Sequence, residues 1–114
     1  MDKFIINNFT SNDELIDRVN LYIEKIEEAL ALINSDKTKA YSFLVEIRKS
    51  LKFEIKIGKN IKLTTSKNML VNYYNSLEVA LIRSSFKNSR HKDGLESNLR
   101  EIRHELEYLK CMLN

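Results

Sequence analysis

The amino-acid sequence contains no proline and only two glycines among its 114 residues. β-Sandwiches and β-barrels need many turns, and those turns draw heavily on proline and glycine. A chain so poor in both is expected to form a few long elements, which favours α-helices. Its apolar fraction of 43% and its charged fraction of 31% are typical of a globular domain. We therefore predict a single all-α domain that spans residues 1–114.

The first half of the chain contains two segments whose apolar residues recur at the three- and four-residue steps of an amphipathic helix. The first helix is predicted at about 12–34, because Ser11 and Glu14 have the spacing of a capping box. Asn34-Ser35-Asp36 ends it and can cap the next helix. The second helix is predicted at about 37–58, with Gly58 as a left-handed stop.

The second half contains two more such segments. The third helix is predicted at about 66–86, after Thr64-Thr65-Ser66, with one of Tyr73 and Tyr74 in the core. In the fourth, Asp93-Gly94-Leu95-Glu96 has capping-box spacing. Six apolar residues then follow a heptad pattern, namely Leu95, Leu99, Ile102, Leu106, Leu109 and Leu113. This seam predicts nearly parallel helix axes and fits packing inside one chain better than a dimeric coiled coil.

Short connections make consecutive helices antiparallel neighbours, so the topology is predicted as an up-down-up-down four-helix bundle. Residues 53–64 allow a second interpretation, because apolar and polar residues alternate on both sides of Gly58-Lys59-Asn60, as in a β-hairpin. The apolar stripe from Ala40 to Ile55 is unbroken at helical spacing, and it makes the helix the preferred prediction. The short hairpin remains its alternative.

Charge is spread unevenly along the chain. Residues 1–36 carry three basic and eight acidic side chains, residues 37–92 carry thirteen and three, and residues 93–114 carry three and five. The two middle helices are adjacent in a square antiparallel bundle, so one basic and one acidic side are expected. The first basic cluster lies beside two apolar residues that fall off the core stripe; together they are Lys49, Lys52, Phe53, Lys56, Ile57, Lys59 and Lys62. The second cluster is Arg83, Lys87, Arg90 and Lys92.

A basic and apolar surface of this kind suits a macromolecular partner. We expect a non-enzymatic interaction module that binds a protein through a basic and apolar face on the second and third helices, with the first cluster as its partner-binding residues. An adaptor, a secretion chaperone, a bacteriocin-type immunity protein and a phage-encoded inhibitor all fit this description, and a homodimer is compatible with it. The alternative is sequence-independent binding of nucleic acid, in which the same lysines neutralise phosphates. The excess of lysine over arginine argues against base-specific readout.

Two stretches bear on the nucleic-acid alternative. Leu63-Thr64-Thr65-Ser66-Lys67 opens the third predicted helix, and Glu105-Leu106-Glu107-Tyr108-Leu109-Lys110 lies in the fourth. This pairing resembles the small helical subunit of type III CRISPR effector complexes. The resemblance implies a basic helical bundle that lines the RNA and the target strand.

The sequence offers no constellation of catalytic residues. His91 and His104 are the only histidines, and of Glu101 and Glu105 only Glu101 is in helical register with His104. Carboxylate-bridged metal sites in bundles need two such pairs and further glutamates. We expect no enzymatic activity, no metal and no cofactor. The single cysteine, Cys111, fits a reducing compartment. Neither a membrane-spanning run nor a signal peptide is recognisable, so we expect a cytoplasmic protein that does not enter a membrane.

Overall fold

The computed structural model describes the backbone of residues 12–64, 68–85 and 91–114, and the side chains of 13–58, 70–85 and 91–114. These residues form four helices and no strand. The helices are α2 (Asn12–Leu32), α3 (Lys37–Thr64), α4 (Asn68–Arg83) and α5 (Lys92–Leu113). The predicted all-α fold is therefore confirmed for the described part of the chain.

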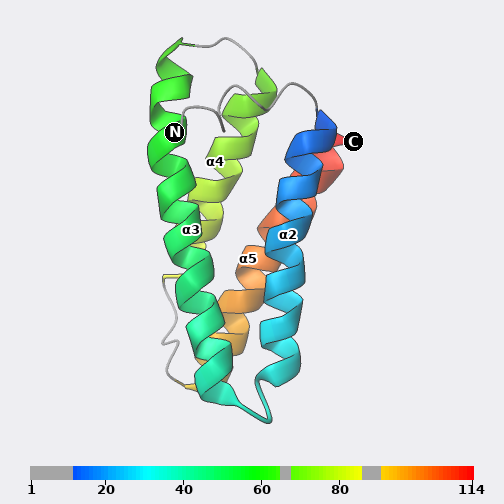
Figure 1. Cartoon of the computed structure of the whole chain (residues 1–114), viewed down its shortest axis with the longest axis vertical. Helices are drawn as coiled ribbons and strands as arrows, with labels where there is room; N and C mark the ends of the chain where they lie inside the picture. The colour runs from blue at the N-terminus through cyan, green and yellow to red at the C-terminus, as the bar shows by residue number, and fades with distance from the viewer. Residues whose placement is uncertain (1–11, 65–67, 86–90) are drawn as a thin grey trace.

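The four helices form a square antiparallel bundle that measures 43 × 23 × 23 Å. Each helix packs against its neighbours in sequence, and α2 packs against α5 to close the square. In Figure 1, α2 and α3 lie in front, with α4 and α5 behind them. This arrangement confirms the up-down-up-down topology.

The interior of the bundle is filled by apolar side chains from all four helices. All six residues of the heptad seam on α5 are buried inside the chain, which confirms that the seam belongs to an intramolecular bundle. Tyr73 and Tyr74 are both buried, although the sequence predicted only one of them in the core. Their rings meet edge to face, with centroids 5.1 Å apart and an angle of 81° between the planes.

One of the predicted helix caps is present in the structure and another is not. The Oδ1 atom of Asp36 accepts a hydrogen bond from the backbone N–H of Lys39 at 3.1 Å, so Asp36 caps α3 as predicted. The capping box predicted at Asp93 is wrong, because α5 begins earlier and its N-cap is His91. Asp93 lies in the first turn instead, where its charge complements the helix dipole. Ser11, the predicted cap of α2, lies outside the described residues.

Gly58 does not end its helix, contrary to the prediction. α3 runs on through residues 53–64 to Thr64, which also excludes the β-hairpin alternative. Gly58 does not have a positive φ, so it does not act as a left-handed stop. It is needed for close packing, since a Cβ atom at this position would lie only 2.3 Å from Cδ1 of Tyr74 on α4.

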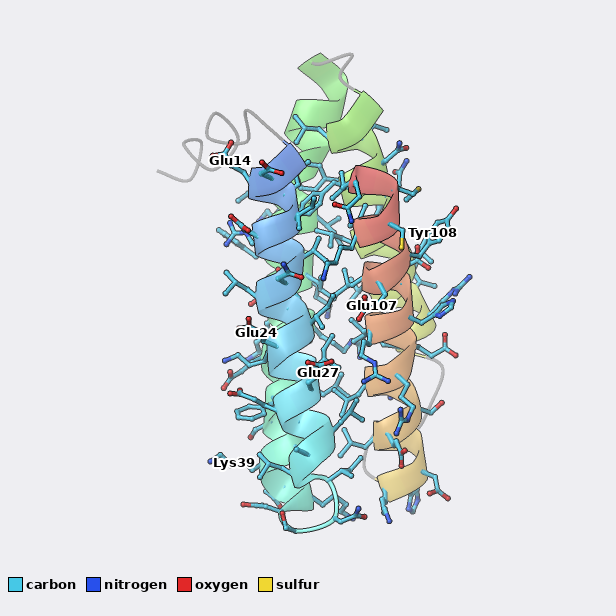
Figure 2. The ribbon with its side chains drawn as sticks, turned by 90° about the vertical axis from the view of Figure 1, so that its right-hand side faces the viewer. Glu14, Glu24, Glu27, Lys39, Glu107 and Tyr108 are labelled. Atoms are coloured by element: carbon cyan, nitrogen blue, oxygen red, sulfur yellow. The ribbon has the colours of Figure 1, made fainter. Side chains whose placement is uncertain are left out.

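The charges are arranged less symmetrically than expected. Figure 2 shows the side formed by α2 and α5, where acidic residues such as Glu27 and Glu107 lie. Basic residues are concentrated on α3, whereas α4 contains a single acidic and a single basic residue, Glu78 and Arg83. The expectation of a basic third helix is therefore wrong for α4. Three of the basic residues assigned to it, Lys67, Lys87 and Arg90, lie outside the described residues.

None of the helices in the described part of the chain has the length and hydrophobicity that a bilayer-spanning segment requires.

Candidate functional site

A pocket of about 460 Å³ opens on the surface between α2 and α3. Four residues of α2 and six of α3 line it. Those that determine its character are Arg18, Leu21, Tyr22, Lys49, Phe53 and Glu54. Tyr22 and Glu54 are buried and form its floor, whereas Leu21 and Phe53 are exposed and form its mouth.

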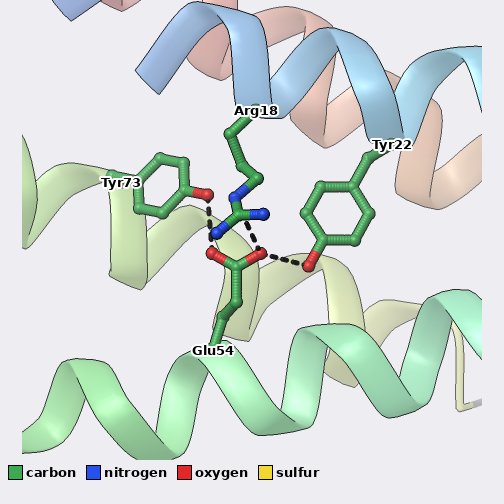
Figure 3. A network of polar contacts seen from close by, with 4 residues as sticks. All are labelled: Arg18, Tyr22, Glu54 and Tyr73. Carbon is green, nitrogen blue, oxygen red and sulfur yellow. Dashed lines mark hydrogen bonds and ion pairs between the residues drawn. The ribbon is translucent and has the colours of Figure 1, made fainter. Parts of the chain in front are cut away.

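The floor of the pocket is a polar network centred on Glu54, whose side chain is buried (Figure 3). The hydroxyl group of Tyr73 donates a hydrogen bond to Oε1 of Glu54 at 2.9 Å, and the hydroxyl group of Tyr22 donates one to Oε2. The Nε atom of Arg18 lies 3.6 Å from the same Oε2 atom. Because these residues come from α2, α3 and α4, the network ties three helices together.

Burial shifts the ionisation of the tyrosines around this network. Loss of solvation and the nearby charge of Glu54 raise the pKa of Tyr22 and of Tyr73 well above the usual value of 10. The same two causes raise the pKa of Tyr74 to about 12. Arg18 opposes these shifts but does not cancel them. The hydroxyl groups of Tyr22 and Tyr73 therefore remain protonated at neutral pH and can keep donating to Glu54.

The sequence interpretation missed Glu54 and Arg18, yet the pattern contained a signal for both. Glu54 follows Leu51 by three residues and Ile47 by seven, which places a carboxyl group on the core stripe of its helix. Arg18 likewise follows the buried Leu15 by three residues. Both oxygens of Glu54 are engaged by partners, so this group is suited to holding helices in register rather than to exchanging protons with a substrate.

The mouth of the pocket is apolar. Leu21 on α2 is 60% exposed, and Phe53 on α3 is 50% exposed. Towards one end of the pocket, the Nζ atom of Lys25 lies 3.7 Å from Oε1 of Glu46 and 5.4 Å from the centroid of the Phe43 ring. The mouth thus combines two large exposed apolar side chains with charges along its border.

The structure brings together only part of the predicted first cluster. Lys49 and Phe53 both line the pocket. Lys52 and Lys56 are exposed on α3, whereas Ile57 is half-buried. The remaining two members of the cluster, Lys59 and Lys62, belong to α3, but their side chains lie outside the described part of the structure.

The predicted second cluster has fewer exposed and uncompensated charges among the described residues. Arg83, at the end of α4, has its Nη1 atom 3.5 Å from Oε1 of Glu105 on α5, so its charge is partly compensated. Lys92 is exposed at the start of α5. Lys87 and Arg90 fall among residues that the structure does not describe. The second cluster therefore gives a weaker basis for a binding site than the first.

Candidate metal ligands are scattered. Within the described ranges, no three histidine, cysteine, aspartate or glutamate side chains are grouped so that they could hold a metal ion. His104 is exposed on α5, and Cys111 is an exposed free thiol.

Replacing Glu54 with glutamine should lower the free energy of unfolding by about 2 kcal/mol. The amide offers only one acceptor oxygen to two tyrosine donors, and it removes the charge that Arg18 faces. Glu46→Gln is the matched control, because Glu46 is on the same helix in an exposed ion pair that contributes less than about 1 kcal/mol. Urea denaturation followed by circular dichroism measures both. Equal effects of the two substitutions would contradict a stabilising role for the network.

Comparison of the chain with protein-family models, with curated proteins and with solved structures found no match.

Proposed function

We propose that this chain is a non-enzymatic protein-interaction module whose docking site is the pocket between α2 and α3. The observation that carries the proposal is the pair of exposed apolar side chains at the pocket mouth, Leu21 and Phe53. A single exposed apolar residue is ordinary on a protein surface. Two large ones on adjacent helices beside a shared pocket are typical of a surface that becomes covered.

The lysines of α3 fit the same role. Lys49, Lys52 and Lys56 are exposed on the helix that supplies Phe53. Charges at the border of an apolar contact steer the encounter and select the partner more than they add affinity. We therefore expect the partner to place an apolar side chain at the pocket and acidic side chains against the lysines.

The polar network gives the docking site a fixed shape. Arg18 and Tyr22 on α2 both contact Glu54 on α3 (Figure 3), and all three residues line the pocket. A surface that is ordered before binding loses less conformational entropy when the partner arrives. The network therefore supports binding by holding the lining of the pocket in place.

Phe53→Glu should abolish binding, with a loss of affinity of about a hundredfold or more, because it places a charge at the centre of an apolar contact. Tyr108→Glu is the matched control, since Tyr108 is an aromatic residue of similar exposure (58%) on α5 and should change affinity by no more than about twofold. A photo-crosslinking amino acid at position 53 or 108, introduced in living cells, identifies the partner by mass spectrometry. Titration of the purified partner then measures the affinities.

The outcome also separates this proposal from nucleic-acid binding. Position 53 should give a protein adduct that position 108 does not give, and the purified chain should show only the weak absorbance at 260 nm of its own tyrosine and phenylalanine side chains. No protein adduct at position 53, or co-purified nucleic acid that is released by high salt and lost in a Lys49→Ala, Lys52→Ala, Lys56→Ala variant, would overturn the proposal in favour of phosphate binding by the lysines.

A further inference from the structure

The relative heights of α2 and α3 follow from three contacts between them. Arg18 and Tyr22 both meet Glu54, and Lys25 meets Glu46, and the average of the three sets the heights. The helices are antiparallel and each rises 1.5 Å per residue, so a step forward along α2 corresponds to a step back along α3. By this rule Leu21 lies level with the segment around Phe53.

The two helices carry matching outer stripes. On α2 the stripe is Asp17, Leu21 and Glu24, and on α3 it is Lys49, Phe53 and Lys56. Both stripes have a charge, an apolar residue and a charge at steps of four and three residues, so each lies along one side of its helix. All six side chains are exposed, and Glu24 is labelled at the edge of α2 in Figure 2.

The two stripes also match in height. Averaged over the three contacts, Asp17 lies level with Lys56, Leu21 lies within about one residue of Phe53, and Glu24 lies level with Lys49. One side of the molecule therefore presents an acidic stripe and a basic stripe of the same length. Within the described part of the chain, the four charged members of the stripes form no ion pair.

We infer that the protein docked on this surface is a second copy of the same chain, related by a two-fold axis parallel to the helices. The inference rests on the proposed function, because it names the partner of the same site. Such an axis lays α2 of each copy on α3 of the other at the same height. Asp17 then faces Lys56 of the second copy, Leu21 faces Phe53, and Glu24 faces Lys49, and each contact occurs twice.

Charge complementarity selects this axis over the other two-fold arrangement of the same faces. An axis perpendicular to the helices would lay α2 on α2 and α3 on α3, so that acidic residues face acidic ones and lysines face lysines. In the parallel arrangement, charges flank an apolar centre as they do in a coiled coil. Glu28 comes near Glu46 of the second copy, but each Glu46 is already paired with Lys25 in its own chain.

The size of the face is compatible with a stable dimer. One side of the bundle measures 43 × 23 Å, and a typical stable interface covers about 800 Å² on each partner. The apolar centre consists of two leucines and two phenylalanines, beside the two pockets. This composition predicts a dimer that dissociates at low concentration rather than an obligate one.

Sedimentation equilibrium of the full chain tests the inference. The wild-type chain should associate from its monomer mass of 13.4 kDa to twice that mass as the concentration rises. Asp17→Lys and Lys56→Asp should each weaken the dimer by about tenfold, because each reverses the charge at two ion pairs.

An equimolar mixture of these two variants should regain wild-type affinity. In the mixed dimer, the two substituted side chains face each other with opposite charges, and the unchanged Asp17 of one variant faces the unchanged Lys56 of the other. Glu107→Lys is the control, because it makes an equal charge change on α5 and should leave the dimer unaffected.

The result also separates the two proposals. A wild-type chain that stays monomeric up to about 1 mM, or a mixture of the two variants that associates no better than either alone, overturns the inference of a second copy. If position 53 then still crosslinks to a different protein, the interaction module stands with another partner. If position 53 gives no protein adduct, both proposals fall.

Discussion

Replacing Gly58 with alanine is expected to lower the free energy of unfolding by about 3 kcal/mol, although alanine is the better helix former by about 1 kcal/mol. The new Cβ atom would lie 2.3–2.6 Å from three ring atoms of Tyr74, which is far inside van der Waals contact. The ring of Tyr74 has little freedom to move away, because it is buried and its neighbour Tyr73 packs against it edge to face. α3 and α4 must therefore separate, which loosens packing along their contact.

Gly94→Ala, in the first turns of α5, is the control for this prediction. It should raise stability slightly, through helix propensity alone. The urea denaturation midpoints of the two variants are compared. A double variant, Gly58→Ala with Tyr74→Leu, should recover part of the lost stability, because the second substitution removes the ring. A Gly58→Ala variant as stable as the wild type would show that close approach of the two helices is not what the glycine provides.

Raising the pH above 10 is expected to unfold the protein steeply. Tyr22, Tyr73 and Tyr74 have pKa values that are raised in the folded state, while in the unfolded chain their pKa is close to 10. Between these values the folded state binds more protons than the unfolded state, so stability falls as the pH rises. Their contribution is fully present below pH 10. Above pH 10, each tyrosine lowers the free energy of unfolding by about 1.4 kcal/mol per pH unit, and the three together lower it by about 4 kcal/mol per pH unit.

The pH range over which each of the three tyrosines destabilises the fold is different. Tyr74 stops contributing near pH 12, whereas Tyr22 and Tyr73 continue to destabilise the fold beyond that point. About 8 kcal/mol is lost by pH 12, which is most or all of the roughly 5–15 kcal/mol by which a domain of this size is stable. Tyrosinate absorbance at 295 nm and circular dichroism should change together. Tyr22→Phe should reduce the slope by about one third, and an unchanged slope would contradict the assignment.

Much of the fold could be predicted from the sequence because its signals are local and repeated. The heptad seam from Leu95 to Leu113 is the spacing of a helix with one buried side, and all six of its residues proved to be buried. Asp36 caps α3 as predicted, because a cap depends only on neighbours in the chain. Gly58 was misjudged as a stop because its role depends on a ring from another helix.

The candidate site could be predicted only in part, because it depends on contacts between different helices. Phe53 was recognised because it falls off the core stripe, and it proved to be half exposed beside a pocket. The contribution of Leu21 could not be predicted from α3 alone, since it depends on which side of α2 faces the same pocket. Glu54 and Arg18 were overlooked because the role of a charged residue at a core position can be recognised only when its partners on other helices are known.

For the residues that the structure describes, the sequence by itself determined the type of structure, the number of helices and their antiparallel order, because apolar spacing and short connections act over a few residues at a time. Only the tertiary structure decided what Gly58 and Glu54 do. Gly58 permits the ring of Tyr74 to approach α3, and Glu54 accepts hydrogen bonds from tyrosines on two other helices. Both roles depend on atoms that are far apart in the chain, and such contacts exist only once the helices have packed.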